Sequence, residues 1–123
     1  MTKIKILYAS DDDEIKQGIK LHSQKLWPEI FLDDTPVDSL CDKLRGDPNW
    51  SFVIVHINWN GQQEVYEITD RCRGLSNAIF VGESNVYPHG KEEVLRHFDE
   101  YGNPIDFFEY IPELLRKYCF ISE

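Results

Sequence analysis

The stretch S-F-V-I-V-H-I-N-W-N-G, residues 51–61, decides the fold of this chain. Its first half is β-branched and aromatic and carries no acidic or basic residue besides His56, which is typical of a central parallel strand buried on both faces. Polar and turn-forming residues follow at once. In an open α/β sheet, ligands bind just past the carboxyl ends of the strands. His56, Asn58, Trp59 and Asn60 are therefore the first candidates for a functional role.

Strands and helices alternate along the rest of the sequence. Apolar runs predict four more strands, at residues 3–9, 29–32, 78–81 and 106–111. Amphipathic spacing and helix-ending residues predict helices at residues 15–26, 37–44, 65–73, 91–101 and from Pro112 onward. Strands separated by helices of this size are parallel, with right-handed crossovers. We expect a single domain over residues 1–123 with a three-layer, doubly wound α/β fold and a five-stranded parallel sheet.

The charge balance of the chain is acidic. Its 123 residues include 22 acidic and 13 basic residues, a formal charge of -9. A field of this sign repels phosphate backbones, so direct nucleic-acid binding is not expected, and basic or apolar partners are favoured. The sequence has neither an apolar run of about 18 residues nor a signal-peptide pattern, so it predicts a cytoplasmic protein without a membrane span.

Three cysteines are present, at positions 41, 72 and 119. They are odd in number, far apart in the sequence and placed among apolar neighbours. The pattern favours buried free thiols in a reducing cytosol over a redox or metal role.

Acidic residues cluster where two predicted strands end. Asp11 and Asp12 lie in the run S-D-D-D-E after the first strand, and Asp33 follows the second. Such an oxygen-rich edge could bind Mg²⁺ or Ca²⁺ weakly. Capping of the next helix explains the residues after the first strand equally well, and no other cofactor is expected.

Aromatic residues gather in two places. Trp59 and Tyr87 lie near the same sheet edge, where they could form a partner surface or simply pack against a loop. The carboxyl-terminal third has more aromatic residues than one strand and one helix face need. This excess predicts contact with another chain through Tyr101, Phe107, Phe108, Tyr110 and Tyr118.

The order of these motifs resembles a response-regulator receiver domain of the CheY-like type. The resemblance rests on the acidic cluster after the first strand, V-I-V-H-I-N-W-N-G with the helix after it, the later E-Y-G, and D-F-F-E-Y-I-P-E-L-L. It implies a flavodoxin-like sheet with strand order 2-1-3-4-5 and a role in two-component signal transduction. It also implies that a protein partner or a second copy docks on the fourth helix, fifth strand and fifth helix.

The residues that receive phosphate in that family are missing. The acceptor carboxylate at the end of the third strand is replaced by His56, or by Asn58 if the register slips by two. The family lysine before the proline of the fifth strand falls on Tyr110 or Ile111, ahead of Pro112.

Two further family positions also differ. The threonine or serine after the fourth strand falls on Gly82, with Ser84 the nearest hydroxyl, and Ser10 stands first in the acidic pair that holds magnesium. Phosphoryl transfer depends on such metal and cation contacts. The resemblance therefore implies a pseudo-receiver, a phosphorylation-independent signalling and protein-interaction module without catalytic residues.

A second resemblance gives an alternative function. L-Y-A-S-D-D-D-E-I and E-I-F-L-D-D resemble the first two strands of TIR domains. This resemblance implies an NAD-processing or nucleotide-sensing domain, with Glu64 or Glu67 as the catalytic carboxylate. Binding of a small ligand without turnover is a third alternative, which the lack of a glycine-rich phosphate loop after the first strand disfavours.

Overall fold

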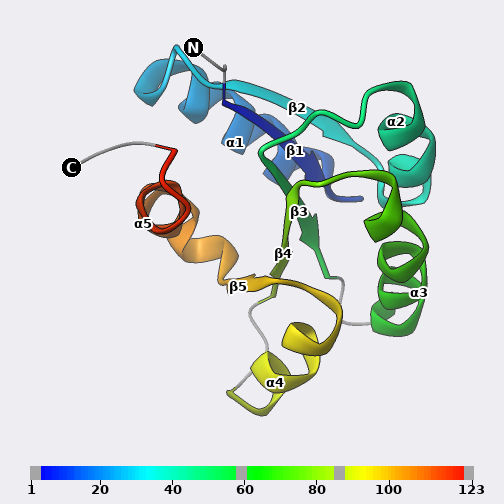
Figure 1. The fold of residues 1–123 in the computed structure, drawn as a ribbon. Coiled ribbons are helices and arrows are strands. Elements are labelled where there is room, and N and C mark those ends of the chain that lie inside the picture. The colour runs from blue at the N-terminus through cyan, green and yellow to red at the C-terminus, as the bar shows by residue number, and fades with distance from the viewer. Residues whose placement is uncertain (1–3, 58–60, 85–87, 121–123) are drawn as a thin grey trace.

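Five parallel strands form one sheet in the computed structural model, which describes residues 4–57, 61–84 and 88–120 (Figure 1). The strands are β1 (Lys5–Ala9), β2 (Phe31–Thr35), β3 (Phe52–His56), β4 (Ile79–Glu83) and β5 (Glu100–Gly102). Their order is β2-β1-β3-β4-β5, and every neighbouring pair is parallel. The predicted doubly wound α/β fold and its strand order are therefore confirmed.

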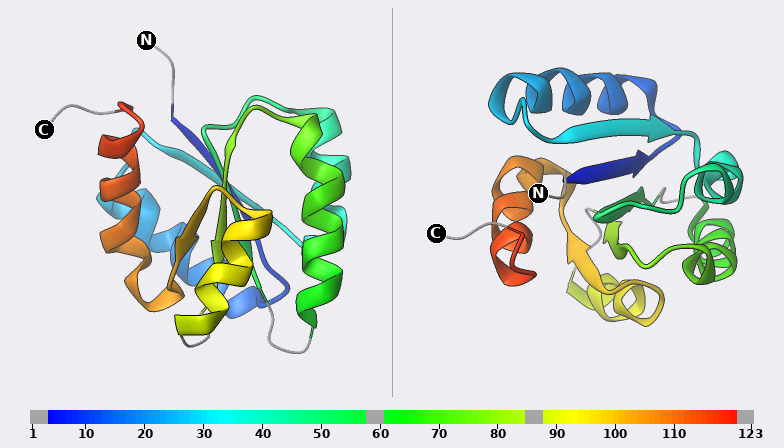
Figure 2. Two further views of the ribbon diagram at one scale, coloured as in Figure 1. Left: turned by 60° about the horizontal axis from the view of Figure 1, so that its bottom comes forward. Right: turned by 45° about the horizontal axis from the view of Figure 1, so that its top comes forward.

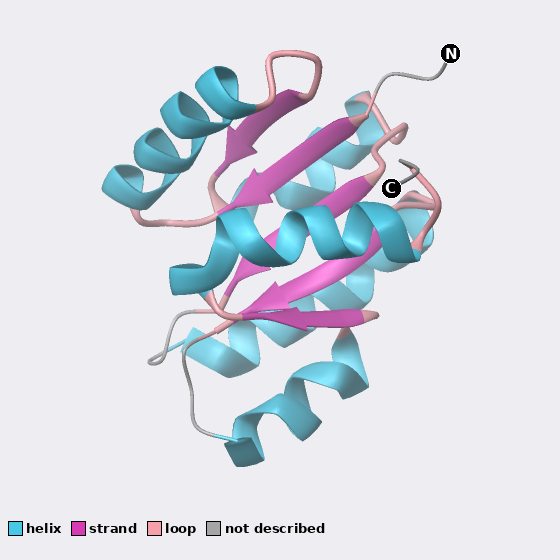
Figure 3. Cartoon of the chain, turned by 90° about the vertical axis from the view of Figure 1, so that its left-hand side faces the viewer, coloured by secondary structure: helices cyan, strands magenta, loops and turns pink. Residues whose placement is uncertain are grey.

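Five α-helices cover the two faces of the sheet (Figures 2 and 3). They are α1 (Asp13–Leu26), α2 (Leu40–Gly46), α3 (Gln62–Cys72), α4 (Pro88–His97) and α5 (Phe107–Lys117). The short 3₁₀ turns are η1 (Val37–Ser39), η3 (Arg73–Leu75) and η4 (Pro104–Asp106). Along the described parts of the chain, no helix combines the length and the apolar composition that crossing a membrane requires.

The alternation of side chains along the strands divides the core into two layers. Ile6 and Tyr8 of β1 belong to the cluster that packs against α1 and α5, whereas Leu7 and Ala9 belong to the cluster under α2, α3 and α4. The first four residues of β3 are fully buried. The prediction that this strand is buried on both faces is confirmed.

The prediction of the fifth strand was wrong. The edge strand β5 is the E-Y-G segment, while residues 106–111 complete η4 and begin α5. Phe107, Ile111, Leu114 and Leu115 are all buried at a helical spacing. Asn103 caps η4 by accepting a hydrogen bond from the Ile105 amide, so the helical segment starts earlier than Pro112.

The other observed element boundaries differ from the predicted ones by a few residues. The second strand spans residues 31–35 instead of 29–32, and α4 spans residues 88–97 instead of 91–101. The fourth strand extends two residues past Val81, so Gly82 and Glu83 belong to β4 and not to a loop. This extension brings a carboxylate into the sheet.

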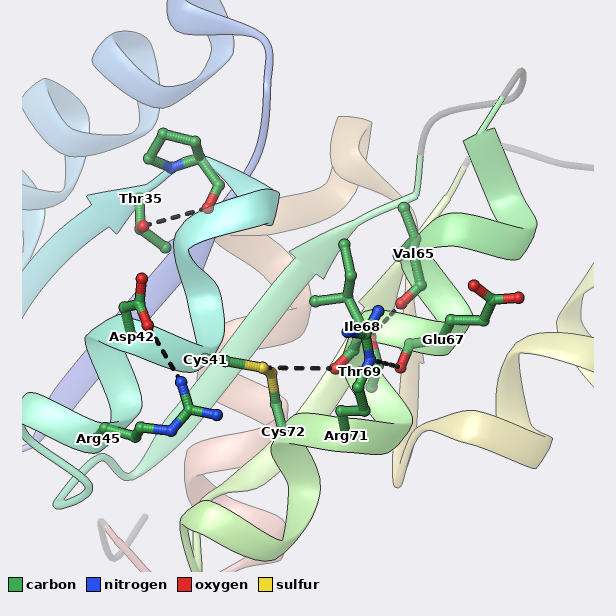
Figure 4. The surroundings of a disulfide bond; sticks show 11 residues. Thr35, Cys41, Asp42, Arg45, Val65, Glu67, Ile68, Thr69, Arg71 and Cys72 are labelled. Carbon is green, nitrogen blue, oxygen red and sulfur yellow. Dashed lines mark hydrogen bonds and ion pairs between the residues drawn. A yellow bond between two sulfur atoms is a disulfide. The ribbon is translucent and has the colours of Figure 1, made fainter.

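The cysteine prediction was wrong as well. Cys41 of α2 and Cys72 of α3 form a disulfide, with their Cα atoms 5.3 Å apart (Figure 4). Cys119, expected to be buried, is exposed and carries a free thiol. The two bonded cysteines are separated by 31 positions in the sequence, and they meet because α2 and α3 pack side by side on one face of the sheet.

Candidate functional site at the carboxyl edge of the sheet

The carboxyl ends of β1 and β3 open into a cleft of about 460 Å³. It is lined by Asp11, Asp12, Asp13, Glu14, Val37, His56 and Val65. His56 and two of the predicted acidic residues are thus brought together at the edge where α/β sheets bind their ligands. Asn58, Trp59 and Tyr87 lie outside the described residues.

His56 is the last residue of β3, at the position where the resemblance places a phosphate acceptor. It pairs in register with Glu83 of the neighbouring strand β4. Its Nδ1 lies 3.3 Å from Glu83 Oε1, and 18% of its side chain is exposed. Because a carboxylate only accepts hydrogen bonds, Nδ1 carries the proton in this contact.

Glu83 is the centre of a buried polar cluster at this edge. Its side chain is fully buried. Tyr8 Oη of β1 donates a hydrogen bond to Oε1, and Tyr110 Oη of α5 donates one to Oε2. We call Glu83, Tyr8, Tyr110 and His56 the Glu83 cluster. It joins four elements, β1, β3, β4 and α5, through one carboxylate.

Burial and the nearby carboxylate change the acidity of both tyrosines. Desolvation raises the pKa of Tyr8 well above its ordinary value, and the charge and hydrogen bond of Glu83 raise it further. The same causes, in the same order, raise the pKa of Tyr110. Both phenols therefore remain protonated donors to Glu83 across the physiological pH range.

Sequence reasoning missed Glu83. One signal was present, a carboxylate directly behind the apolar run I-F-V-G at the end of a predicted strand. A charged residue at such a position is rarely buried unless it has partners. Those partners come from residues 75 positions before it and 27 positions after it, so no local pattern could reveal them.

Gly82 takes the position of the family's threonine or serine because a side chain has no space there. A Cβ atom on Gly82 would lie 2.5 Å from Val94 Cγ1 and 2.6 Å from Phe98 Cδ2. The hydroxyl of Ser84 belongs to a side chain that is 1% exposed. A hydroxyl group is therefore excluded from position 82 by the packing of α4 on β4.

The structure also changes which residue corresponds to the family lysine. Because β5 ends at Gly102, the proline that follows the fifth strand is Pro104, and the residue before it is Asn103. The sequence-based alignment on Tyr110 or Ile111 was thus wrong, although its conclusion that this position carries no lysine is unchanged. The side chain of Asn103 accepts a hydrogen bond from the Ile105 amide, 3.0 Å away, at the start of η4.

The acidic residues after β1 serve mainly as caps. Asp12 Oδ1 accepts the amide of Ile15 at 3.1 Å and begins α1, and Asp11 Oδ1 accepts the amide of Val37 at 3.1 Å. Within residues 4–57, 61–84 and 88–120, no three His, Cys, Asp or Glu side chains form a group that could hold a metal ion. The weak Mg²⁺ or Ca²⁺ site stays a prediction without geometric support from these residues.

Asp33 does not join the acidic edge. It lies inside β2 opposite Leu7, and its carboxylate pairs with Lys43 at 2.7 Å and Lys20 at 3.9 Å. Burial alone would raise the pKa of Asp33, but the hydrogen bonds from Lys43 and the Asp34 amide and the nearby lysine charges lower it. Its charge is therefore compensated by lysines of α1 and α2, outside the cleft.

The aromatic residues predicted to form an interaction surface are mostly engaged within the chain. Phe107 is 1% exposed and belongs to the core, and Tyr110 is held by Glu83. Phe108 makes tilted ring contacts with Trp27 and His22, Tyr101 donates a hydrogen bond to the Ser84 carbonyl, and Tyr118 donates one to Glu100. Burial therefore contradicts the surface role of Phe107.

The carboxylates of the alternative function lie on α3. Glu64 lines a hollow of about 200 Å³ beside the cleft, together with Asp38, Ile68 and residues of the cleft wall. Glu67 is exposed on the same helix. The TIR-like function stays a prediction, since neither position tests it.

The Glu83 cluster predicts a characteristic alkaline transition. Both tyrosines have a raised pKa in the folded state, so their contribution to stability is complete below about pH 10, the ordinary tyrosine pKa, and is lost as the pH rises above it. We expect the free energy of unfolding to fall by about 1.4 kcal/mol per pH unit for each of the two residues. Phenolate absorbance reports the ionisation of the tyrosines, and urea unfolding at each pH reports the free energy of unfolding.

Tyr8→Phe is the matched variant for this measurement. It removes one hydrogen-bond donor to a buried carboxylate, which lowers the free energy of unfolding by about 1–3 kcal/mol. Above about pH 10, it also removes the contribution of one tyrosine to the fall of the free energy of unfolding with pH. Ionisation of all six tyrosines near pH 10 in a protein that stays folded would contradict the description of the cluster.

The comparisons with known proteins identify the fold. No family model and no curated protein matches the sequence. A chain in the crystal structure of the phosphorylated P1 domain of CheA3 in complex with CheY6 from R. sphaeroides is similar, with a TM-score of 0.68 at 11% identity, covering 98% of this chain and 100% of that chain.

Two response regulators are similar to the same degree. One, from red light signaling of R. palustris, gives a TM-score of 0.67 at 18% identity over 92% of both chains. The other, the N-terminal domain of a response regulator receiver protein from Methanoculleus marisnigri, gives 0.65 at 12% identity over 94% of this chain and 96% of that one. These likenesses, together with the strand order, show that the chain has the fold of CheY-like receiver domains.

Proposed function

We propose that this chain is a phosphorylation-independent signalling module that acts by binding a protein partner. The observation that carries the proposal is His56 at the end of β3, with its ring directed to the buried carboxylate of Glu83. In a receiver domain, the resemblance places an acceptor carboxylate at this position. Here an imidazole and an internal carboxylate take the place of that acceptor.

The charges around the cleft also oppose phosphoryl transfer. Transfer requires cations that stabilise the charge developing on the phosphoryl group. The described lining of the cleft has four carboxylates and neither lysine nor arginine. Glu83 pairs with His56 across β3 and β4, so a phosphoryl group bound at His56 would lie next to a further carboxylate.

The edge beyond β5 is the surface through which the module would bind its partner. Among the described strands, β5 pairs only with β4, and two apolar side chains lie close to it in the sequence, Leu95 of α4 and Ile105 of η4. Leu95 is 42% exposed and Ile105 is 83% exposed. We call these two residues the β5-edge pair. Exposed apolar side chains favour association with another chain.

The partner that fits best is a protein with apolar and basic side chains. The formal charge of -9 attracts basic surfaces and opposes close association of two copies of this chain. The location of the module in the cytoplasm, expected from the sequence, stays a prediction.

Incubation with acetyl phosphate and Mg²⁺ tests phosphorylation independence. We expect the intact mass to remain unchanged, because His56 stands where the acceptor carboxylate is expected and the described lining of the cleft has neither lysine nor arginine. A receiver domain with an intact acceptor aspartate, treated in parallel, confirms that the reagent is active. Stoichiometric addition of a phosphoryl group to this chain would refute the proposal, and loss of that addition in His56→Ala would locate it.

Paired surface variants test the proposed binding edge. Leu95→Asp combined with Ile105→Asp should weaken partner binding at least tenfold, since it places two charges in an apolar contact. Leu21→Asp on α1 is the matched control, because Leu21 is also apolar and is 60% exposed. Sedimentation of each variant reports self-association, and titration with a partner first isolated on the immobilised wild-type protein reports affinity.

Two results would count against this surface. The first is equal loss of binding in Leu21→Asp and in the double variant. The second is full binding by the double variant when its thermal stability matches that of the wild type.

A further inference from the structure

The Cys41–Cys72 disulfide connects α2 to α3, the helix that contributes Val65 to the lining of the acidic cleft. Cys41 lies in the first turn of α2 and is partly exposed, whereas Cys72 is the last residue of α3 and is fully buried (Figure 4). We propose that these two cysteines form a reversible redox pair, which fixes α2 to α3 when oxidised and lets the two helices separate when reduced. This inference goes beyond the proposed function and does not depend on it.

The fold should survive reduction because other contacts hold the same helices. Leu40 and Leu44 of α2 are fully buried, and Val65 and Tyr66 of α3 are at most 5% exposed. All four belong to one apolar cluster with residues of β1, β3 and β4. A reduced cysteine behaves as a small apolar side chain, so two thiols can occupy the same space in this cluster. The disulfide is therefore an added constraint and not the basis of the core.

The unequal exposure of the two cysteine residues determines how exchange proceeds. A thiolate of a dithiol reductant attacks Sγ of Cys41, the exposed partner, and breaks the Sγ–Sγ bond. Cys72 leaves as a thiolate and takes up a proton. The second thiol of the reductant then attacks the mixed disulfide, so the reductant becomes a disulfide and the protein gains two electrons and two protons.

The position of the bond links this chemistry to the cleft. Cys41 lies just after η1, which contributes Val37 and Asp38 to the hollow beside the cleft. Cys72 lies one helical turn after Ile68, and α3 contributes Glu64, Val65 and Ile68 to the opposite wall. Val37 and Val65 line the main cleft as well. The disulfide thus fixes the separation of the two walls, and its reduction should loosen them.

The environment of the bond matches a reversible role better than a purely structural one. In the reducing cytosol that the sequence predicts, disulfides are usually transient and redox-sensing, and the described residues otherwise form an apolar core in two layers. Partial exposure of Cys41 permits attack by a protein dithiol without unfolding. The exposed Cys119 has no part in the pair.

The experiment uses the full chain with Cys119→Ser, so that only the pair can react. Native protein is equilibrated in dithiothreitol redox buffers of graded potential, trapped with a maleimide and resolved by mass. Hydrogen exchange is measured for the fully oxidised and fully reduced forms. Cys41→Ser combined with Cys119→Ser is the control that cannot form the bond.

We expect no reactive thiol in the oxidised form, two in the reduced form, and full reversal without denaturant. Reduction should lower Tm by about 10 °C while the circular dichroism spectrum at room temperature is unchanged, as closure of a loop of this length implies. Amides of α2 should exchange at least tenfold faster in the reduced form, and those of β1 and β3 at the same rate. The control should show the fast exchange in both buffers.

Three results would overturn the proposal. In the first, both thiols stay reactive in native protein after oxidation, so the bond does not form. In the second, the bond opens only in denaturant. In the third, α2 exchanges equally fast in both redox states, so the bond does not constrain the helix.

Discussion

The carboxylate of Glu83 is the constraint on which the carboxyl edge of this structure depends. It is fully buried within the sheet, where an unpaired charge would cost several kcal/mol. Tyr8 and Tyr110 donate to its two oxygens, and His56 approaches one of them. Because these partners come from β1, α5 and β3, satisfying one carboxylate fixes the relative positions of three other elements. The orientation of the His56 ring follows from the same requirement.

This constraint also supports the proposal that the receiver-like scaffold acts without phosphate. In phosphoryl transfer, the polar groups at the end of the third strand must be available to an incoming anion. Here they are satisfied within the chain, and the packing of Tyr110 against Gly102 holds α5 next to them. A Cβ atom on Gly102 would lie 2.6 Å from the Tyr110 ring, so this close approach requires glycine. The described polar groups at this edge are thus engaged with one another through Glu83.

The sequence was sufficient to predict the fold because its signals were local. The run from Phe52 to Val55 indicated a central strand, and the alternation of strands and helices indicated parallel order. The fifth strand was misplaced because the apolar residues of D-F-F-E-Y-I fit the spacing of a strand as well as that of a helix. Only the burial of Phe107, Ile111 and Leu114 on one helix face identifies the segment as helical. The edge strand itself is three residues long, too short to give a pattern.

The site was only partly predictable because its key contacts are distant in sequence. His56 and the acidic residues were found from their place after a strand, and the structure puts them in one cleft. Glu83 and the disulfide were missed, since each depends on partners at least 27 positions away that no spacing rule connects. Asp33 was assigned to the wrong place because the predicted second strand ended too early. Errors in strand boundaries thus became errors in the site.

The nitrogen-15 NMR spectrum of the His56 imidazole, recorded before and after addition of Mg²⁺ and beryllofluoride, tests the central claim most directly. The account predicts a ring protonated at Nδ1 whose signals, and those of the Gly82 and Tyr110 amides, do not move when the phosphoryl mimic is added. Saturable shifts at His56 and Gly82 that require both reagents would show that the cleft binds a phosphoryl group and would contradict a site already filled by the protein itself.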